Sequence, residues 1–240
     1  MPSCTTCNVC EQPQSSEDAD DVARVPCQLR QFNAHYFTVW RCSHCLSLHS
    51  KEDVDLATYY RDYPGHKVKL DPAIEIGFRN RLRLLKQRGL RRDAKILDFG
   101  CGSGLFVDYL RRAGYGRAVG YDEYVPRFCN PQVLEASYDA VVSYDVIEHM
   151  EAPRACLEKL SSIVAPGGLL VIGTPNAENV TLKRRPFELE LRQPFHRHIR
   201  SERALVELAG KLGLAAEHVH RRLYIDSLYP NNAPPALNIS

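Results

Sequence analysis

Three glycines at every second position, Gly100, Gly102 and Gly104, follow the short apolar run 95–99. Apolar residues then resume at helical spacing, so this stretch predicts a buried strand, a tight turn and a helix. A turn built from glycine lets the backbone approach a ligand closely, and the helix behind it presents unpaired N–H groups. Asp122 lies eighteen residues beyond Gly104, after a second apolar segment. A carboxylate at that place suits a ribose diol, so the pattern indicates a ligand that carries a ribose.

A second group of reactive side chains lies near the N-terminus, where Cys7 pairs with Cys10 and Cys42 pairs with Cys45 in two C-x-x-C motifs. Four thiolates arranged as two such pairs can close a tetrahedral zinc site. The 31 residues between the pairs exceed the usual spacing, and the excess contains a polar, acidic run over 14–21 that predicts a loop. The spacing therefore predicts a zinc ribbon, with a closed site that has no open position for chemistry.

The ligand set of this ribbon has alternatives. Cys4 forms a competing pair with Cys7, and Cys27 or His44 offers a substitute ligand. The aromatic and β-branched run 35–41 predicts a strand leading into the second pair. A metal-free cysteine-rich segment is the competing interpretation. Because the segment is net acidic, we expect it to stabilise the fold or cover the substrate rather than bind nucleic acid.

The elements that must position these groups alternate between strand and helix. Past the glycine turn we expect a helix over 105–113, strands over 117–122, 138–144 and 169–173, and a helix over 153–164. Ser201 caps a helix over 202–212, and strands follow over 215–220 and, at the end, 223–228. Alternation of this kind predicts an α/β fold with a parallel sheet. Only 16 residues separate Asp122 from Asp139, so a third strand is reduced to a stub at 132–134.

A helix beginning at Pro72 precedes this core. Its apolar stripe comprises Ile74, Phe78, Leu82 and Leu85, and its basic residues, including Arg81, are expected largely outside that stripe. Between the ribbon and this helix lies an aromatic connector. Its tyrosines, Tyr59, Tyr60 and Tyr63, either cover the bound ligands or pack the two domains together.

Residues 75–220 resemble class I S-adenosylmethionine-dependent methyltransferases, especially the branch of the ubiquinone-biosynthesis O-methyltransferases. The resemblance rests on the glycine turn, Asp122, the strand 138–142, the pair Glu148-His149 and the turn 166–168 before the strand 169–172. It implies a Rossmann-like class I methyltransferase sheet, shortened between its second and fourth strands and preceded by a small zinc-ribbon domain. We expect the ribbon at 1–50, the connector at 51–72, and the methyltransferase domain at 73–240 with an acceptor-binding insertion near 177–200.

The resemblance also implies the site residues. S-adenosylmethionine would be held by Asp98, Gly100, Cys101, Gly102, Gly104, Asp122 and Asp145. His149 and His198 are the expected catalytic residues, with His198 as a general base. Family members with E-x-x-E-H hold a divalent metal there. This chain has Asp145 at the first position, so a metal at Asp145, Glu148 and His149 is an alternative to a metal-free site.

Composition sets limits on function. The 240 residues include nine cysteines and carry a net charge of +2, with 44% hydrophobic residues. No apolar run approaches a membrane span and no signal-peptide pattern opens the chain, so we expect a cytoplasmic protein with reduced thiols.

A small-molecule acceptor is expected, methylated on oxygen, nitrogen or carbon. RNA methylation and a non-catalytic zinc-ribbon adaptor are the alternatives. The sequence does not indicate an oligomeric state.

Overall fold

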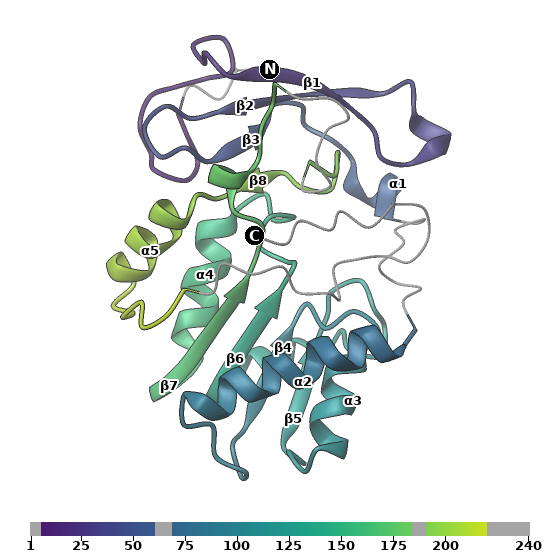
Figure 1. Cartoon of the computed structure of the whole chain (residues 1–240), viewed down its shortest axis with the longest axis vertical. Helices are drawn as coiled ribbons and strands as arrows, with labels where there is room; N and C mark the ends of the chain where they lie inside the picture. The colour runs from purple at the N-terminus through teal and green to yellow at the C-terminus, as the bar shows by residue number, and fades with distance from the viewer. Residues whose placement is uncertain (1–5, 61–68, 184–190, 220–240) are drawn as a thin grey trace.

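The computed structural model describes residues 6–60, 69–183 and 191–219, which form a parallel sheet and a smaller antiparallel sheet (Figure 1). Within these residues the parallel sheet has the order β5 (Ala118–Tyr121), β4 (Ile96–Phe99), β6 (Tyr138–Tyr144) and β7 (Val164–Gly173). Buried strands of a parallel sheet are apolar on both faces. Ile96 accordingly packs into one core and its neighbour Leu97 into the other.

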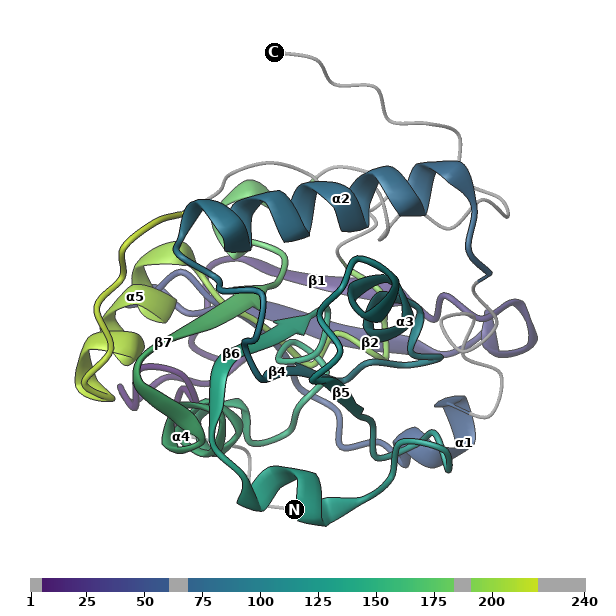
Figure 2. The ribbon, with the colours of Figure 1, turned by 90° about the horizontal axis from the view of Figure 1, so that it is seen from below.

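Helices cover both faces of the parallel sheet (Figure 2). On one face α2 (Pro72–Gln87) and α3 (Leu105–Arg112) pack over Ile96, and on the other α4 (Pro153–Ser162) packs over Leu97. The predicted stripe of α2 is buried, and Asp71 caps the helix by accepting a hydrogen bond from the Ile74 N–H at 2.8 Å. This is the expected α/β arrangement.

The N-terminal sheet lies beyond the carboxyl ends of β6 and β7 (Figure 1). In the described residues its antiparallel order is β1 (Val22–Pro26), β2 (Tyr36–Arg41), β3 (Leu48–Ser50) and β8 (His198–Ile199). The predicted strand over 35–41 is thus confirmed as β2. The fourth strand, β8, comes from the far end of the chain. Val25 and Val39 of this sheet pack with Ala177, Val180, Leu182 and Leu191.

Several sequence-based expectations were wrong. Residues 131–135 form a short 3₁₀ helix (Pro131–Glu135), so the stub of a third strand at 132–134 is absent. Asn130 caps that helix and Pro131 begins it, a combination that favours a helical turn over a strand. Of the strand expected at 215–220, the described residues 215–219 have no strand. The strand expected at 223–228 lies outside the described residues.

Arg81 is a further correction, because it is 8% exposed rather than part of the solvated face of α2. Its guanidinium carbon lies 3.6 Å from the centre of the Tyr144 ring and 5.6 Å from that of Phe106. The helical pattern placed Arg81 beside the stripe, and the aromatic face of Tyr144 makes burial favourable for a weakly hydrated guanidinium. A cation is therefore buried where β6 ends and α3 begins.

The connector packs on the N-terminal sheet. Tyr59, in α1 (Leu56–Tyr60), lies with its ring 4.9 Å from that of Phe32, and its hydroxyl is 3.0 Å from His35 Nδ1. These contacts support a packing role for Tyr59. Tyr63 lies outside the described residues.

Ser201 joins α5 (Glu202–Lys211) to the turn that carries Cys45. Its hydroxyl accepts from the Ala204 N–H at 3.0 Å and donates to the Cys45 carbonyl. We expect Ser201→Ala to lower the free energy of unfolding by about 2 kcal/mol, since it removes a helix cap and leaves a buried carbonyl unpaired. Chemical denaturation would measure this. The control is Ser162→Ala, an exposed serine at the end of α4, and equal effects of the two changes would contradict the assignment.

Candidate functional site

The glycine turn and Asp122 meet at the carboxyl ends of β4 and β5. Asp122 accepts a hydrogen bond from the Gly102 N–H at 2.8 Å through one carboxylate oxygen, and from the Tyr124 N–H at 2.9 Å through the other. Gly100 and Gly104 have φ of 75° and 79°, in the left-handed region that favours glycine. The predicted juxtaposition of turn and carboxylate is therefore present.

Two more of the expected ligand-binding residues lie beside this turn. Asp98 is 5% exposed and is the third residue of β4. Cys101 is half-buried, with its sulfur directed toward Gly120 of β5. Burial, and then the charges of Asp98 and Asp122, raise the pKa of the Cys101 thiol, so it stays protonated and is a poor nucleophile.

The loop after Asp122 folds back over the turn, which sequence reasoning did not foresee. Phe128 is buried, and its ring lies so close to Gly104 that a Cβ there would sit 2.3 Å from Phe128 Cζ. The Asp122 N–H donates to the Phe128 carbonyl at 3.3 Å. Tyr124, in the same loop, exposes 54% of its surface. The spacing of residues in the sequence does not predict these contacts, because they depend on how the short segment between β5 and β6 folds back.

The end of β6 carries the second part of the site. Asp145 has a φ of 55°, a rare conformation for a residue other than glycine. Glu148 is fully buried and accepts from the Thr174 hydroxyl at 3.0 Å. Burial, together with the charge of Asp145, raises the pKa of Glu148 to about 8. Its neighbour His149 has its pKa lowered to about 3, first by desolvation and then by the charge of Arg192. His149 is therefore neutral at physiological pH.

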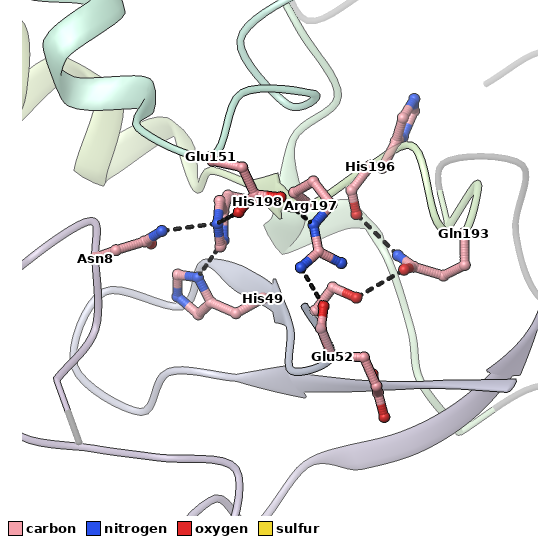
Figure 3. A network of polar contacts seen from close by, with 9 residues as sticks. Asn8, His49, Glu52, Glu151, Gln193, His196, Arg197 and His198 are labelled. Carbon is pink, nitrogen blue, oxygen red and sulfur yellow. Dashed lines mark hydrogen bonds and ion pairs between the residues drawn. The ribbon is translucent and has the colours of Figure 1, made fainter. Parts of the chain in front are cut away.

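The histidine that faces His149 is His196 rather than His198. The ring centres of His149 and His196 are 4.8 Å apart at an angle of 83°, and both can lie with Glu148 around one small cation. His198 is turned toward the N-terminal sheet, where its Nδ1 is 3.1 Å from His49 Nδ1 and its Nε2 is 2.8 Å from Asn8 Nδ2 (Figure 3). His196 follows the turn at 193–195 and lies outside β8, whereas His198 is held in that strand opposite His49, which separates the two rings.

The four predicted cysteines lie together, with all their sulfur atoms within 4.8 Å of one another. The Cys7 and Cys45 sulfurs are 3.8 Å apart, as are those of Cys10 and Cys42. A disulfide would need about 2.05 Å, so these are separate thiols. Neither alternative ligand joins them. Cys27 packs with Phe37 in another cluster, and His44 is exposed; Cys4 lies outside the described residues.

A parallel sheet covered by helices on both faces, with a glycine turn after β4 and an acidic residue after β5, defines a Rossmann-like class I methyltransferase fold. The sequence profile of the "Methyltransferase domain" family matches residues 71–219, more than half of the chain. The chain belongs to this family.

Proteins of similar sequence are also methyltransferases. An uncharacterised methyltransferase of Mycobacterium bovis is 36% identical over 97 residues, covering 33% of this chain and 49% of the relative. The mitochondrial ubiquinone biosynthesis O-methyltransferase of Dictyostelium discoideum is 29% identical over 113 residues, covering 34% and 35%. The chain therefore spans about half or less of the length of these relatives. Among solved structures, 1,6-didemethyltoxoflavin-N1-methyltransferase of Burkholderia thailandensis is 16% identical with a TM-score of 0.46, covering 73% of this chain and 84% of that one.

Across the described residues, none of the helices combines the length and apolar character needed to cross a membrane.

Proposed function

We propose that this protein transfers a methyl group from S-adenosylmethionine to an oxygen, nitrogen or carbon atom of a small-molecule acceptor. The observation that carries the proposal is the hydrogen bond between the Asp122 carboxylate and the Gly102 N–H. It places an acidic residue beside the glycine turn, whose backbone can approach a ligand closely. Both lie at the carboxyl ends of neighbouring parallel strands, where open α/β sheets bind their ligands. We also propose that the protein acts in the cytoplasm, in a biosynthetic pathway.

The donor would lie along β4, β5 and β6. In this proposal Asp122 holds the ribose, the turn passes beneath the nucleoside, and the strained Asp145 lies near the methionine part. The remaining residues assigned to the donor are Asp98, Gly100, Cys101, Gly102 and Gly104. Arg81 adds a buried cation beside Tyr144, at the end where a methionine carboxylate needs a partner.

Methyl transfer depends mainly on how the donor and the acceptor are positioned. A methyl sulfonium is an activated donor, so the transfer needs in-line placement of the acceptor and, for a hydroxyl, removal of a proton. His149, neutral near pH 7, and His196 beside it supply imidazoles at the end of β6. We propose these two as the catalytic residues. Both ring nitrogens of His198 contact other side chains, which favours a structural role for it.

The same end of β6 offers a ligand set for a divalent cation. The group that lies together contains Glu148, His149 and His196, so His196 takes the place that the sequence gave to Asp145. One carboxylate and two imidazoles would suit Zn²⁺, Mn²⁺ or Fe²⁺ better than Mg²⁺. Bound there, such an ion would polarise an acceptor hydroxyl.

We propose that Cys7, Cys10, Cys42 and Cys45 hold a structural zinc ion. Zinc–sulfur bonds of about 2.3 Å in a tetrahedron place the sulfurs about 3.8 Å apart. The Cys7–Cys45 and Cys10–Cys42 sulfur separations are both 3.8 Å, so the residues fit the ion. All four positions would be filled by protein, which leaves no place for a substrate.

Calorimetric titration with S-adenosylhomocysteine tests the donor site. We expect micromolar binding, weakened by about tenfold or more in Asp122→Ala, because that change removes the ribose partner and the brace on Gly102. The control is Asp93→Ala, an exposed carboxylate paired with Arg91 outside the site. A folded, zinc-loaded protein that binds no S-adenosylhomocysteine would overturn the proposal and favour an adaptor.

A further inference from the structure

One segment, residues 193–200, begins with a turn at 193–195, carries His196 and leads into β8 of the N-terminal sheet. Its strand β8 pairs with β3, matching His198 with His49. On its other side the N–H groups of Arg197 and His198 donate to the Glu148 carbonyl at 2.7 and 3.1 Å. Since Glu148 precedes His149, this segment is a direct structural link between the N-terminal sheet and the end of β6.

A chain of side-chain contacts connects this segment to the cysteines. Cys7 Sγ lies 3.2 Å from His49 Nε2, and His49 Nδ1 lies 3.1 Å from His198 Nδ1. The chain ends at Asn8, whose amide nitrogen is 2.8 Å from His198 Nε2 (Figure 3). With Cys7 as a thiolate, one set of tautomers satisfies every contact: Asn8 donates to His198, His198 to His49, and His49 to the sulfur.

Other contacts hold the backbone of His196 to the same sheet. The Gln193 amide donates to the His196 carbonyl at 2.8 Å and accepts from the Ser50 hydroxyl at 2.8 Å. Arg197 donates to Glu151 at 2.8 Å and to the Glu52 carbonyl. In Figure 3 the His196 ring points away from this network, while its carbonyl faces into it. The network therefore fixes the backbone and leaves the ring directed toward His149.

Arg200, at the end of the same segment, is 1% exposed, and within the described residues its guanidinium nitrogens make no hydrogen bond. Burial lowers the pKa of Arg200 to about 10, and Cys156, Glu148, Cys45 and Cys7, when ionised, partly offset that effect. A buried cation needs compensation, and zinc with four thiolates carries a net charge of −2. The charge balance of this region thus favours a loaded cysteine cluster.

We propose that the metal-loaded cysteine cluster positions the catalytic histidine pair, with His49 and His198 as the positioning residues that transmit its geometry to His196. This proposal rests on the function proposed above, because it assigns a role at the same site. A metal ligand commonly fixes its surroundings through hydrogen bonds to its neighbours. Here the contact between Cys7 and His49 continues through His198 in β8, two residues after His196.

Proton NMR of the zinc-loaded protein, with histidine rings labelled by ¹³C, tests the proposal. The readout is the NOE between the rings of His149 and His196, whose centres are 4.8 Å apart. We expect His49→Leu to lose this NOE, while His49→Gln retains it because an amide can bond both the sulfur and His198. His44→Gln is the matched control, an exposed histidine between two ligands of the cluster, and should leave the NOE unchanged.

Zinc content and S-adenosylhomocysteine affinity separate the outcomes. His49→Leu should keep its zinc and bind S-adenosylhomocysteine within about threefold of the wild type. An NOE that persists in folded His49→Leu would overturn the positioning role alone. Failure of the wild-type protein to bind S-adenosylhomocysteine would instead overturn the methyltransferase proposal. If His49→Leu does not fold, His198→Leu serves instead, since it removes the contact with His49 from the other side and keeps all four cysteines. A weaker NOE there supports the proposal, and an unchanged one overturns it.

Discussion

Cys42→Ser is expected to abolish stoichiometric zinc binding and to lower the stability of the protein by several kcal/mol. Binding of a structural zinc ion is coupled to folding, and in small zinc domains it supplies about 10–16 kcal/mol. The cysteine cluster packs directly against Trp40 of β2 and Ala204 of α5. Loss of the zinc ion would therefore weaken the packing of both elements. Elemental analysis would give the zinc content, and thermal unfolding would give the change in stability.

The matched control for this prediction is Cys129→Ser. Cys129 is exposed and lies outside the cluster, so its replacement should leave zinc content and melting temperature unchanged. A Cys42→Ser protein that retained about one zinc per chain, or a zinc-free wild type that melted like the loaded one, would show that the cysteines have another purpose.

Gly104→Ala should cost about 3 kcal/mol of stability and most of the affinity for S-adenosylhomocysteine. The positive φ accounts for about 1–2 kcal/mol, and a Cβ placed 2.3 Å from Phe128 Cζ adds a steric term of about the same size. Moving Phe128 would also disturb Asp122, because the Asp122 N–H bonds the Phe128 carbonyl. Denaturant titration and calorimetry would measure the two effects.

Gly89→Ala measures the backbone part of that effect, so its difference from Gly104→Ala gives the steric part. Gly89 has a φ of 85°, and a Cβ there meets nothing within 4 Å, so this change should cost only the backbone term and leave ligand affinity intact. Phe128→Leu should recover part of the loss when combined with Gly104→Ala, by making room for the methyl group. Equal losses from Gly104→Ala and Gly89→Ala would contradict the close approach of Phe128.

Features encoded in short stretches were predictable from the sequence. The glycine turn needs only adjacent residues, and Asp122 follows from the end of the next strand. The C-x-x-C pairs likewise predicted which four sulfurs would meet, because each pair is local and only the meeting of the two pairs is long-range. The alternation of strand and helix then gave the parallel sheet.

Features that depend on distant contacts were not predictable in the same way. The choice between His196 and His198 depends on where β8 begins, because His198 is paired with β3 and His196 lies before the strand, and no local pattern encodes that pairing. Burial of Arg81 depends on Tyr144, more than sixty residues away, presenting its ring face. The 3₁₀ helix at 131–135 lies in the short segment between β5 and β6, where proline disfavours a strand.

The origin of β8 also determines when the N-terminal sheet can be completed during synthesis. The outer edge of β3 pairs with residues that follow it by about 150 positions, which a ribosome takes about 7–30 s to add. Until then β3 presents an unpaired edge, the kind of surface on which strands of other chains can assemble. The N-terminal sheet, whose first three strands are made before the parallel sheet, is therefore completed after it, and a fragment that stopped before residue 198 would keep that edge exposed.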